Sequence, residues 1–168
     1  MAGPRTALLL NPPFERAVLR DHYCSSEAKS AYLWHPLDLL IQGACLSEAG
    51  YRVAALDAVA LGLGRAAVEA RIRQVSPDVL VTLVSERTWP SDRQLIRYAR
   101  DQGVRQVVAS GDFLRFGSGP VDEAIELVDF VVTDFTTTWL PETLAAGAPS
   151  GLGIATVDDV RNHRYRDL

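Results

Sequence analysis

The stretch Pro36–Asp57, PLDLLIQGACLSEAGYRVAALD, decides the fold class of this chain. Its first half carries apolar residues at helical spacing, which predicts a helix over residues 36–48. Gly50 is placed to end this helix in a left-handed conformation. The apolar run Tyr51–Leu56 that follows predicts a strand. A helix that leads through a glycine into an apolar strand is one unit of an α/β fold.

The same alternation continues on both sides of this stretch. Strands are expected at 6–10, 51–56, 78–84, 104–110 and 129–133, and helices at 36–48, 65–74, 91–102, from Pro120 onward and at 139–146. Strands this apolar are typical of a parallel sheet covered by helices on both faces. Five such units predict an α/β fold with a doubly wound, flavodoxin-like sheet of five parallel strands in the order 2-1-3-4-5. A ligand would bind beyond the carboxyl ends of the strands.

Size and composition fit one globular domain. The chain has 168 residues, 48% apolar and 23% charged, with a net charge of −4. The negative charge argues against a nucleic-acid surface, and no apolar run approaches the ~20 residues that span a bilayer. The N-terminus lacks the features of a signal peptide, so we expect a cytoplasmic protein without a membrane partner. The two cysteines form no Cys-x-x-Cys pair.

The loop after the first strand is the most unusual connection. It opens with Asn11-Pro12-Pro13 and runs to His35, whereas loops in α/β units usually have ~2–6 residues. Its aromatic residues give it enough surface to fold over a ligand, although a surface excursion packed on itself is the alternative. Its histidines are more often solvated residues than metal ligands.

Three further loops reach the same edge. Arg87 and Trp89 follow the third strand, where Trp89 could lie against a flat ring or simply cap a helix. Gly111 follows the fourth strand and permits close approach of a ligand or a plain turn. The loop after the fifth strand is rich in hydroxyl groups, which suit ligand oxygens or a helix cap.

Several familiar motifs are absent from the sequence. No G-x-G-x-x-G or G-x-x-x-x-G-K-[ST] is present, which excludes the dinucleotide fingerprint and the P-loop. No acidic pair follows the first strand, so a phosphoacceptor domain is not expected. Pro12 and Pro13 lack backbone N–H groups, which disfavours a phosphate cradle.

As an ordered set, these segments resemble a known family. NPP, PLDLL, AGY with LDA, PDVLVTLVS, VVASGD and LVDFVVTD are similar to the N-terminal cobalamin-binding domain of cobalamin-dependent radical S-adenosylmethionine enzymes. The resemblance covers roughly residues 6–145. It implies a Rossmann-like fold that binds cobalamin without the Asp-x-His histidine used elsewhere as an axial ligand, because that motif is absent here.

The resemblance also implies where cobalamin would bind. The corrin face would rest on Asn11, Pro12, Arg87, Thr88 and Trp89, and the nucleotide tail on Ser110, Gly111, Asp112 and Thr133. Gly111-Asp112 replaces the usual Gly-Gly pair, and Asp134-Phe135-Thr136 replaces an acidic glycine turn. No catalytic or metal-binding residue is expected in this chain.

The sequence carries no Cys-x-x-x-Cys-x-x-Cys motif for the radical chemistry. We therefore expect residues 1–148 to form the cobalamin domain and 149–168 to be a linker or the start of a missing C-terminal domain. That domain would hold S-adenosylmethionine and the iron–sulfur cluster, and would make the whole protein a methyltransferase or related enzyme. The alternatives are an empty fold that serves as a scaffold and a flavodoxin-like domain that binds a flavin or nucleotide.

Overall fold

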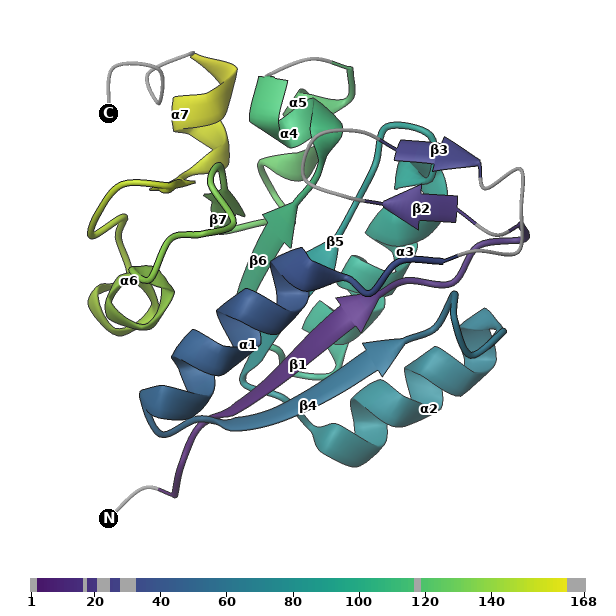
Figure 1. The fold of residues 1–168 in the computed structure, drawn as a ribbon, viewed down its shortest axis with the longest axis horizontal. Coiled ribbons are helices and arrows are strands. Elements are labelled where there is room, and N and C mark those ends of the chain that lie inside the picture. Colours follow the sequence, from purple (N-terminus) through teal and green to yellow (C-terminus); the bar gives the residue numbers. More distant parts are fainter. Residues whose placement is uncertain (1–2, 17, 21–24, 28–32, 117–118, 163–168) are drawn as a thin grey trace.

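The structure is a computed structural model that describes residues 3–16, 18–20, 25–27, 33–116 and 119–162. Its main sheet has six strands: β4 (Arg52–Asp57), β1 (Thr6–Asn11), β5 (Val79–Leu83), β6 (Gln106–Ser110), β7 (Phe130–Val132) and β8 (Ile154–Ala155), in this order (Figure 1). The first five are parallel, and β8 pairs antiparallel with β7. The predicted order 2-1-3-4-5 is confirmed, with one further strand at the β7 edge.

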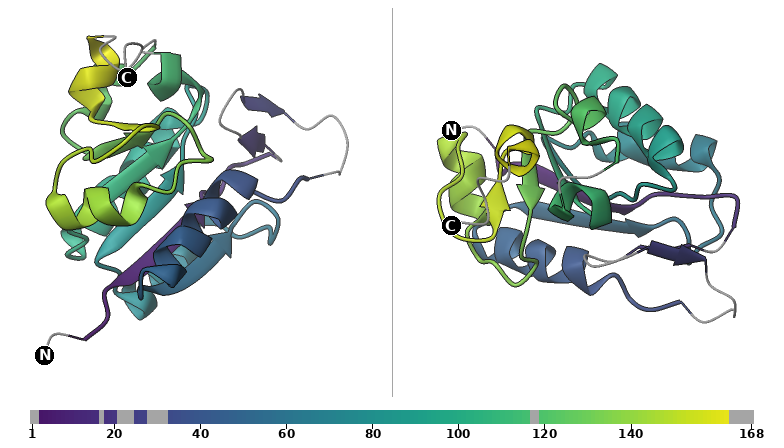
Figure 2. Two further views of the ribbon diagram at one scale, coloured as in Figure 1. Left: turned by 60° about the vertical axis from the view of Figure 1, so that its left-hand side comes forward. Right: turned by 90° about the horizontal axis from the view of Figure 1, so that it is seen from above.

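Helices cover both faces of the sheet (Figure 2). The helices are α1 (Leu37–Glu48), α2 (Arg65–Val75), α3 (Trp89–Asp101), α4 (Asp112–Phe116), α5 (Val121–Ala124), α6 (Leu140–Ala146) and α7 (Val157–Arg161). Two apolar clusters form the core. Leu8 and Leu10 of β1 lie in the cluster with α2 and α3, whereas Leu9 lies in the cluster with α1 and α6. Alternate residues of a strand point to opposite faces, so both faces of β1 are buried.

Helix α1 packs closely on β1 because Gly43 lies at the contact. A Cβ atom at Gly43 would come within 2.4 Å of Leu9 Cδ1. Gly50 follows the helix with φ of 87°, as the sequence predicts. Helix α1 begins near the carboxyl end of β1, which brings residues 33–38 to the ligand edge (Figure 1).

A small hairpin projects beyond the strand ends. Strand β2 (Val18–Arg20) pairs antiparallel with β3 (Ser25–Glu27) in a separate two-stranded sheet. Both strands belong to the long loop after β1, and they lie at the end toward which the parallel strands point (Figure 1).

The fourth helix differs from its prediction. The apolar pattern from Pro120 predicts one helix that includes Ile125 and Val128, but α5 ends at Ala124 and Ile125 is 38% exposed. The chain continues as a turn, in which Val128 N donates to Ala124 O at 2.9 Å. A separate short helix, α4, occupies residues that we expected to be loop. Asp112 begins it by accepting a bond from Phe113 N at 2.8 Å.

Part of the C-terminal stretch packs on the domain. Ile154 and Ala155 form β8, and Val157 and Val160 of α7 are buried in the core beside α4 and α5. Thr156 and Asp159 form a capping box at the start of α7, with Thr156 Oγ1 accepting from Asp159 N at 3.1 Å. The boundary at residue 148 stays a prediction. Within the described part of the chain, every helix is too short or too polar to cross a membrane.

Candidate functional site

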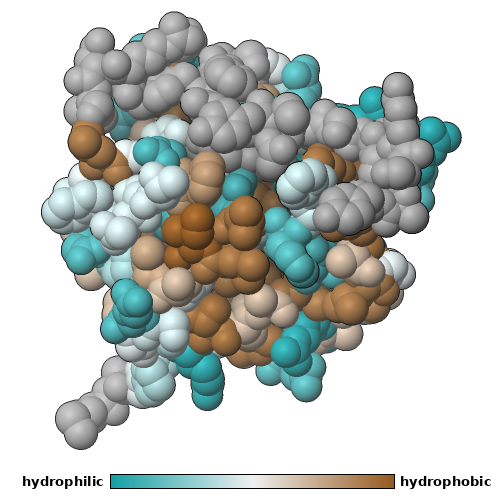
Figure 3. Space-filling model, viewed as in Figure 1, coloured by the Kyte–Doolittle hydropathy of each residue, from teal (hydrophilic) through white to brown (hydrophobic). Residues whose placement is uncertain are grey.

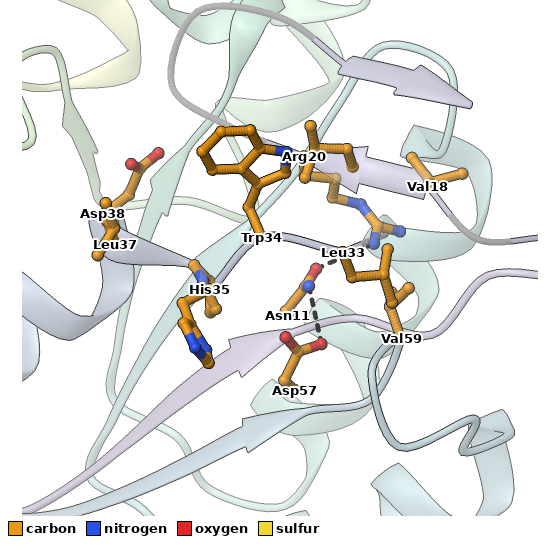
Figure 4. A pocket seen from close by; sticks show the side chains of 12 residues that line it. Asn11, Val18, Arg20, Leu33, Trp34, His35, Leu37, Asp38, Asp57 and Val59 are labelled. Atoms are coloured by element: carbon orange, nitrogen blue, oxygen red, sulfur yellow. Dashed lines mark hydrogen bonds between the residues drawn. The ribbon is translucent and has the colours of Figure 1, made fainter. Parts of the chain in front are cut away.

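A cavity of about 400 Å³ lies at the carboxyl edge of the sheet (Figure 4). Three parts of the chain enclose it: the end of β1 with the following strand β2, the segment 33–38 that leads into α1, and the end of β4. Its lining residues are Asn11, Val18, Leu19, Arg20, Leu33, Trp34, His35, Pro36, Leu37, Asp38, Asp57 and Val59. This is the position at which doubly wound sheets bind ligands.

The cavity combines apolar walls with polar groups at the strand ends. Apolar lining comes from β2, from Leu33 to Leu37 and from Val59. The polar groups include Asn11, Asp38 and Asp57. Trp34, which lines the cavity, is 65% exposed. Such a lining suits a ligand with a broad apolar surface edged by hydrogen-bonding groups.

Asn11 joins the ends of β1 and β4. The two strands pair in register with Asn11 opposite Asp57, and Asn11 Nδ2 donates to Asp57 Oδ1 at 2.9 Å (Figure 4). Asp57 Oδ1 also accepts from Ala60 N at 3.0 Å, which holds the turn after β4. The floor of the cavity is therefore built from paired strand ends.

Arg20 extends this network to α3. Its NH1 donates to Asn11 Oδ1 at 3.2 Å and to the Pro12 carbonyl at 2.7 Å. Its Nε donates to Thr88 Oγ1 at 3.0 Å. Its NH2 donates to Asp92 Oδ1 at 3.0 Å, in an ion pair whose two side chains are fully buried. Four acceptors thus surround one guanidinium group.

The Asp92 carboxylate is the other buried charge of this network. Thr88 Oγ1 donates to its second oxygen, and Ser85 Oγ lies 3.0 Å from Thr88 Oγ1. Burial raises the pKa of Asp92 to about 6, against the opposing effects of Arg20, Thr88 and Ser85. Burial likewise lowers the pKa of Arg20, and Asp92 and Asp57 oppose that shift. For both groups, desolvation outweighs the attraction between the partners.

A second apolar cavity of about 300 Å³ adjoins the first. The two share His35, Pro36 and Asp57, and the second continues over α1 and β4 to Leu40 and Leu61. Leu40 and Leu61 are 45% and 63% exposed. Figure 3 shows apolar side chains gathered on this face of the molecule. The ligand edge is thus continuous with an apolar surface.

The structure brings three of the predicted corrin-face residues together. Asn11, Pro12 and Thr88 all accept hydrogen bonds from Arg20, although only Asn11 lines the cavity.

The other two predicted corrin-face residues lie elsewhere. Trp89 is 2% exposed and packs edge-to-face on Phe113 with ring centroids 5.2 Å apart. Its Nε1 donates to Glu123 Oε2 at 3.1 Å. The indole is therefore part of the core and not open to a flat ring in this conformation. Arg87 is exposed at the surface.

The four residues predicted for the nucleotide tail do not line this cavity. Ser110 is buried at the end of β6, and its carbonyl accepts from Val84 N at 2.9 Å. At Gly111, a Cβ atom would lie 2.0 Å from the Val84 carbonyl oxygen, so this glycine makes room for the chain itself. Asp112 accepts from Glu86 N at 3.1 Å. Thr133 N donates to the Gly153 carbonyl at 2.9 Å, beside β8.

Sequence reasoning missed much of the cavity. Arg20, Asp38, Asp57 and Val59 line it but are not among the predicted site residues, and neither is Asp92, the buried partner of Arg20. Asp57 had a usable signal, since it ends a strand at the ligand edge. Thr88 and Asp92 are polar residues four apart at the start of a helix, a pattern that could have marked a buried pair. Arg20 had no signal, because nothing local distinguishes one arginine in a long loop.

The described residues contain no group of three or more His, Cys, Asp and Glu side chains that could hold a metal ion. Of the three histidines, only His35 is described, and it lines both cavities. His22 lies outside the described residues.

Comparison with known proteins gives a match in structure alone. No family model matches the sequence, and no curated protein does. The fold is similar to two structures of the radical S-adenosylmethionine methyltransferase TsrM from Kitasatospora setae. One contains tryptophan substrate and a SAM analogue, with a TM-score of 0.61, 16% identity and 90% of this chain covered. The other contains cobalamin and a [4Fe-4S] cluster, with a TM-score of 0.60, 17% identity and 91% covered.

The chain spans less than a third of the length of TsrM, since the matches cover 28% and 29% of that protein. At 16% and 17% identity this likeness shows the fold alone, and it agrees with the predicted Rossmann-like fold.

Proposed function

We propose that this chain is the cobalamin-binding module of a cobalamin-dependent radical S-adenosylmethionine methyltransferase. The observation that carries the proposal is the apolar cavity at the carboxyl edge of the sheet. Likeness in fold to a cobalamin-containing structure, across nine tenths of the chain, supports it. Sequence features of the same segments point to the same family.

The residues present fit this cofactor. A corrin ring is broad and largely apolar, and it is edged by amide side chains. The cavity offers apolar walls, an exposed indole at Trp34 and the polar groups of Asn11, Asp38 and Asp57. We infer that these residues hold one side of the ring. The ring itself ligates its cobalt, so a cluster of metal-binding side chains is not needed.

The same cavity disfavours a flavin or nucleotide phosphate. Helix α1 begins beside it, and a helix start attracts anions. Its first turn, however, carries Asp38, whose carboxylate lines the cavity together with Asp57. The guanidinium of Arg20 is already bonded to four protein oxygens. A phosphate bound there would lie in the same cavity as two carboxylates, and the repulsion between like charges would raise the free energy of binding.

Cobalamin, when bound, supplies a cobalt centre that carries a methyl group or exchanges electrons. This chain's residues would bind the ring, orient it and exclude water from one side. S-adenosylmethionine and the iron–sulfur cluster would belong to a further domain, and the cytoplasmic location stays a prediction.

Co-elution distinguishes the candidate ligands. The 168-residue protein is mixed with hydroxocobalamin, or with flavin mononucleotide, and passed over gel filtration under oxidising and reducing conditions. We expect the visible spectrum of cobalamin, and not that of the flavin, to elute with the protein. Flavin alone in the protein peak would favour the flavodoxin-like alternative. Neither ligand in the peak would contradict the proposal and favour an empty scaffold.

A further inference from the structure

The hairpin strand β2 forms one wall of the cavity, yet it does not belong to the main sheet. It has three residues, and among the strands that the structure describes it pairs with β3 alone. An isolated two-stranded ribbon is at best marginally stable in water. Contacts with the body of the domain must therefore hold β2 in place.

The Arg20 side chain provides such contacts. Arg20 is 3% exposed, whereas Leu19 beside it is half-buried. The guanidinium of Arg20 bonds to Asn11 and Pro12 at the end of β1. It also bonds to Thr88 and Asp92 at the start of α3.

We propose that Arg20 is a positioning residue, which fixes β2 as a wall of the ligand cavity by tying it to β1 and α3. The buried guanidinium sets the distance between β2 and the opposite wall formed by residues 33–38. It also orients the Asn11 amide, whose oxygen accepts from Arg20 and whose nitrogen donates to Asp57. Arg20 thus affects ligand binding indirectly, because it positions β2 and orients the Asn11 amide.

The geometry requires arginine in particular. Three guanidinium nitrogens donate to acceptors on two separate elements. A lysine ammonium carries a similar charge but only one nitrogen, so it cannot reproduce this planar arrangement. Preorganised walls reduce the ordering cost of binding, so we expect a loosened β2 to weaken ligand affinity.

The test distinguishes a loosened β2 strand from a loss of the overall fold. Arg20→Met leaves Asp92 buried without its partner, whereas Arg20→Met with Asp92→Leu removes both buried charges and retains apolar volume. Arg20→Lys keeps the charge. The control is Arg65→Met, because Arg65 forms an exposed ion pair with Glu69. Backbone hydrogen exchange of the free 168-residue protein is measured in the peptides that cover β1, β2 and β5.

In the double variant we expect exchange in β2 to be at least tenfold faster, with β1 and β5 unchanged. Arg20→Lys should give an intermediate rate, and Arg65→Met the wild-type rate. Wild-type exchange in β2 of the folded double variant would overturn the proposal. If that variant does not fold, wild-type exchange in β2 of Arg20→Lys would overturn it equally.

The ligand's identity, though not the position of the wall, rests on the proposed function. Hydroxocobalamin is titrated into each variant, and we expect a dissociation constant at least tenfold higher in the double variant than in Arg65→Met. Wild-type protein that binds no hydroxocobalamin would reject the proposed function, and the exchange rates would still decide the role of Arg20. Unchanged affinity in a variant with faster β2 exchange would show that the wall does not contact the ligand, and would overturn its role in binding.

Discussion

At the scale of single residues, Gly111 shows how a glycine at the ligand edge can serve the fold. A Cβ atom there would lie 2.0 Å from a backbone oxygen, which cannot rotate away as a side chain could. We expect Gly111→Ala to lower the free energy of unfolding by at least about 2 kcal/mol, measured by urea denaturation. Gly3→Ala is the control, because no atom lies within 4 Å of the added Cβ and the backbone there is not in the left-handed region. Equal stability of the two variants would refute this account of Gly111.

Asp92 gives a second prediction at this scale. Its pKa of about 6 in the folded state lies above the ordinary value of 3.8, so the folded protein binds the proton more tightly. The stabilisation from this proton is complete below pH 4 and is lost as pH rises through 6. Relative to Asp92→Asn, the wild type should lose on the order of 2 kcal/mol of unfolding free energy between pH 4 and 7. The measurement is urea denaturation across this range. Parallel pH profiles of the two proteins would contradict the shift.

At the scale of elements, the last strand and helix belong to the core. Ile154, Val157 and Val160 are each at most 3% exposed. Burial of such side chains contributes about 1.5–3 kcal/mol each, so a chain ending at residue 148 should be less stable than the full chain by at least about 3 kcal/mol. The full chain is the reference in a thermal or urea melt. If the shortened chain matches the full one, residues 149–162 act only as a linker.

The helices and strands also show which features of the fold and the site can be predicted from the sequence. The order of the parallel strands follows from apolar runs that alternate with helical patterns, and these are local signals. The site depends on contacts across the chain, since Arg20 and Asp92 are 72 positions apart. Their burial depends on where β2 packs, which no periodic pattern encodes. Trp89 shows the same limit. From the sequence, its indole could contact a ligand or belong to the core, and its packing on Phe113 in the structure shows that it belongs to the core.

At the scale of the whole molecule, the ligand edge is a cavity with a built floor and an adjoining apolar face. Paired ends of β1 and β4 form the floor, the hairpin forms one wall and the start of α1 forms the other. The cavity continues onto the apolar face that Figure 3 shows. This arrangement suits a ligand larger than the cavity itself, with one side buried and the other exposed.

An equilibrium titration with hydroxocobalamin tests whether this cavity binds cobalamin. Three proteins are compared by visible absorption: the wild type, Val59→Trp, which fills the cavity, and Leu152→Trp, which adds the same side chain at a residue that is 65% exposed and outside the cavity. We predict one equivalent bound by the wild type and by Leu152→Trp, with affinity at least tenfold weaker in Val59→Trp. Absence of binding by the wild type, or equal binding by all three, would contradict the account.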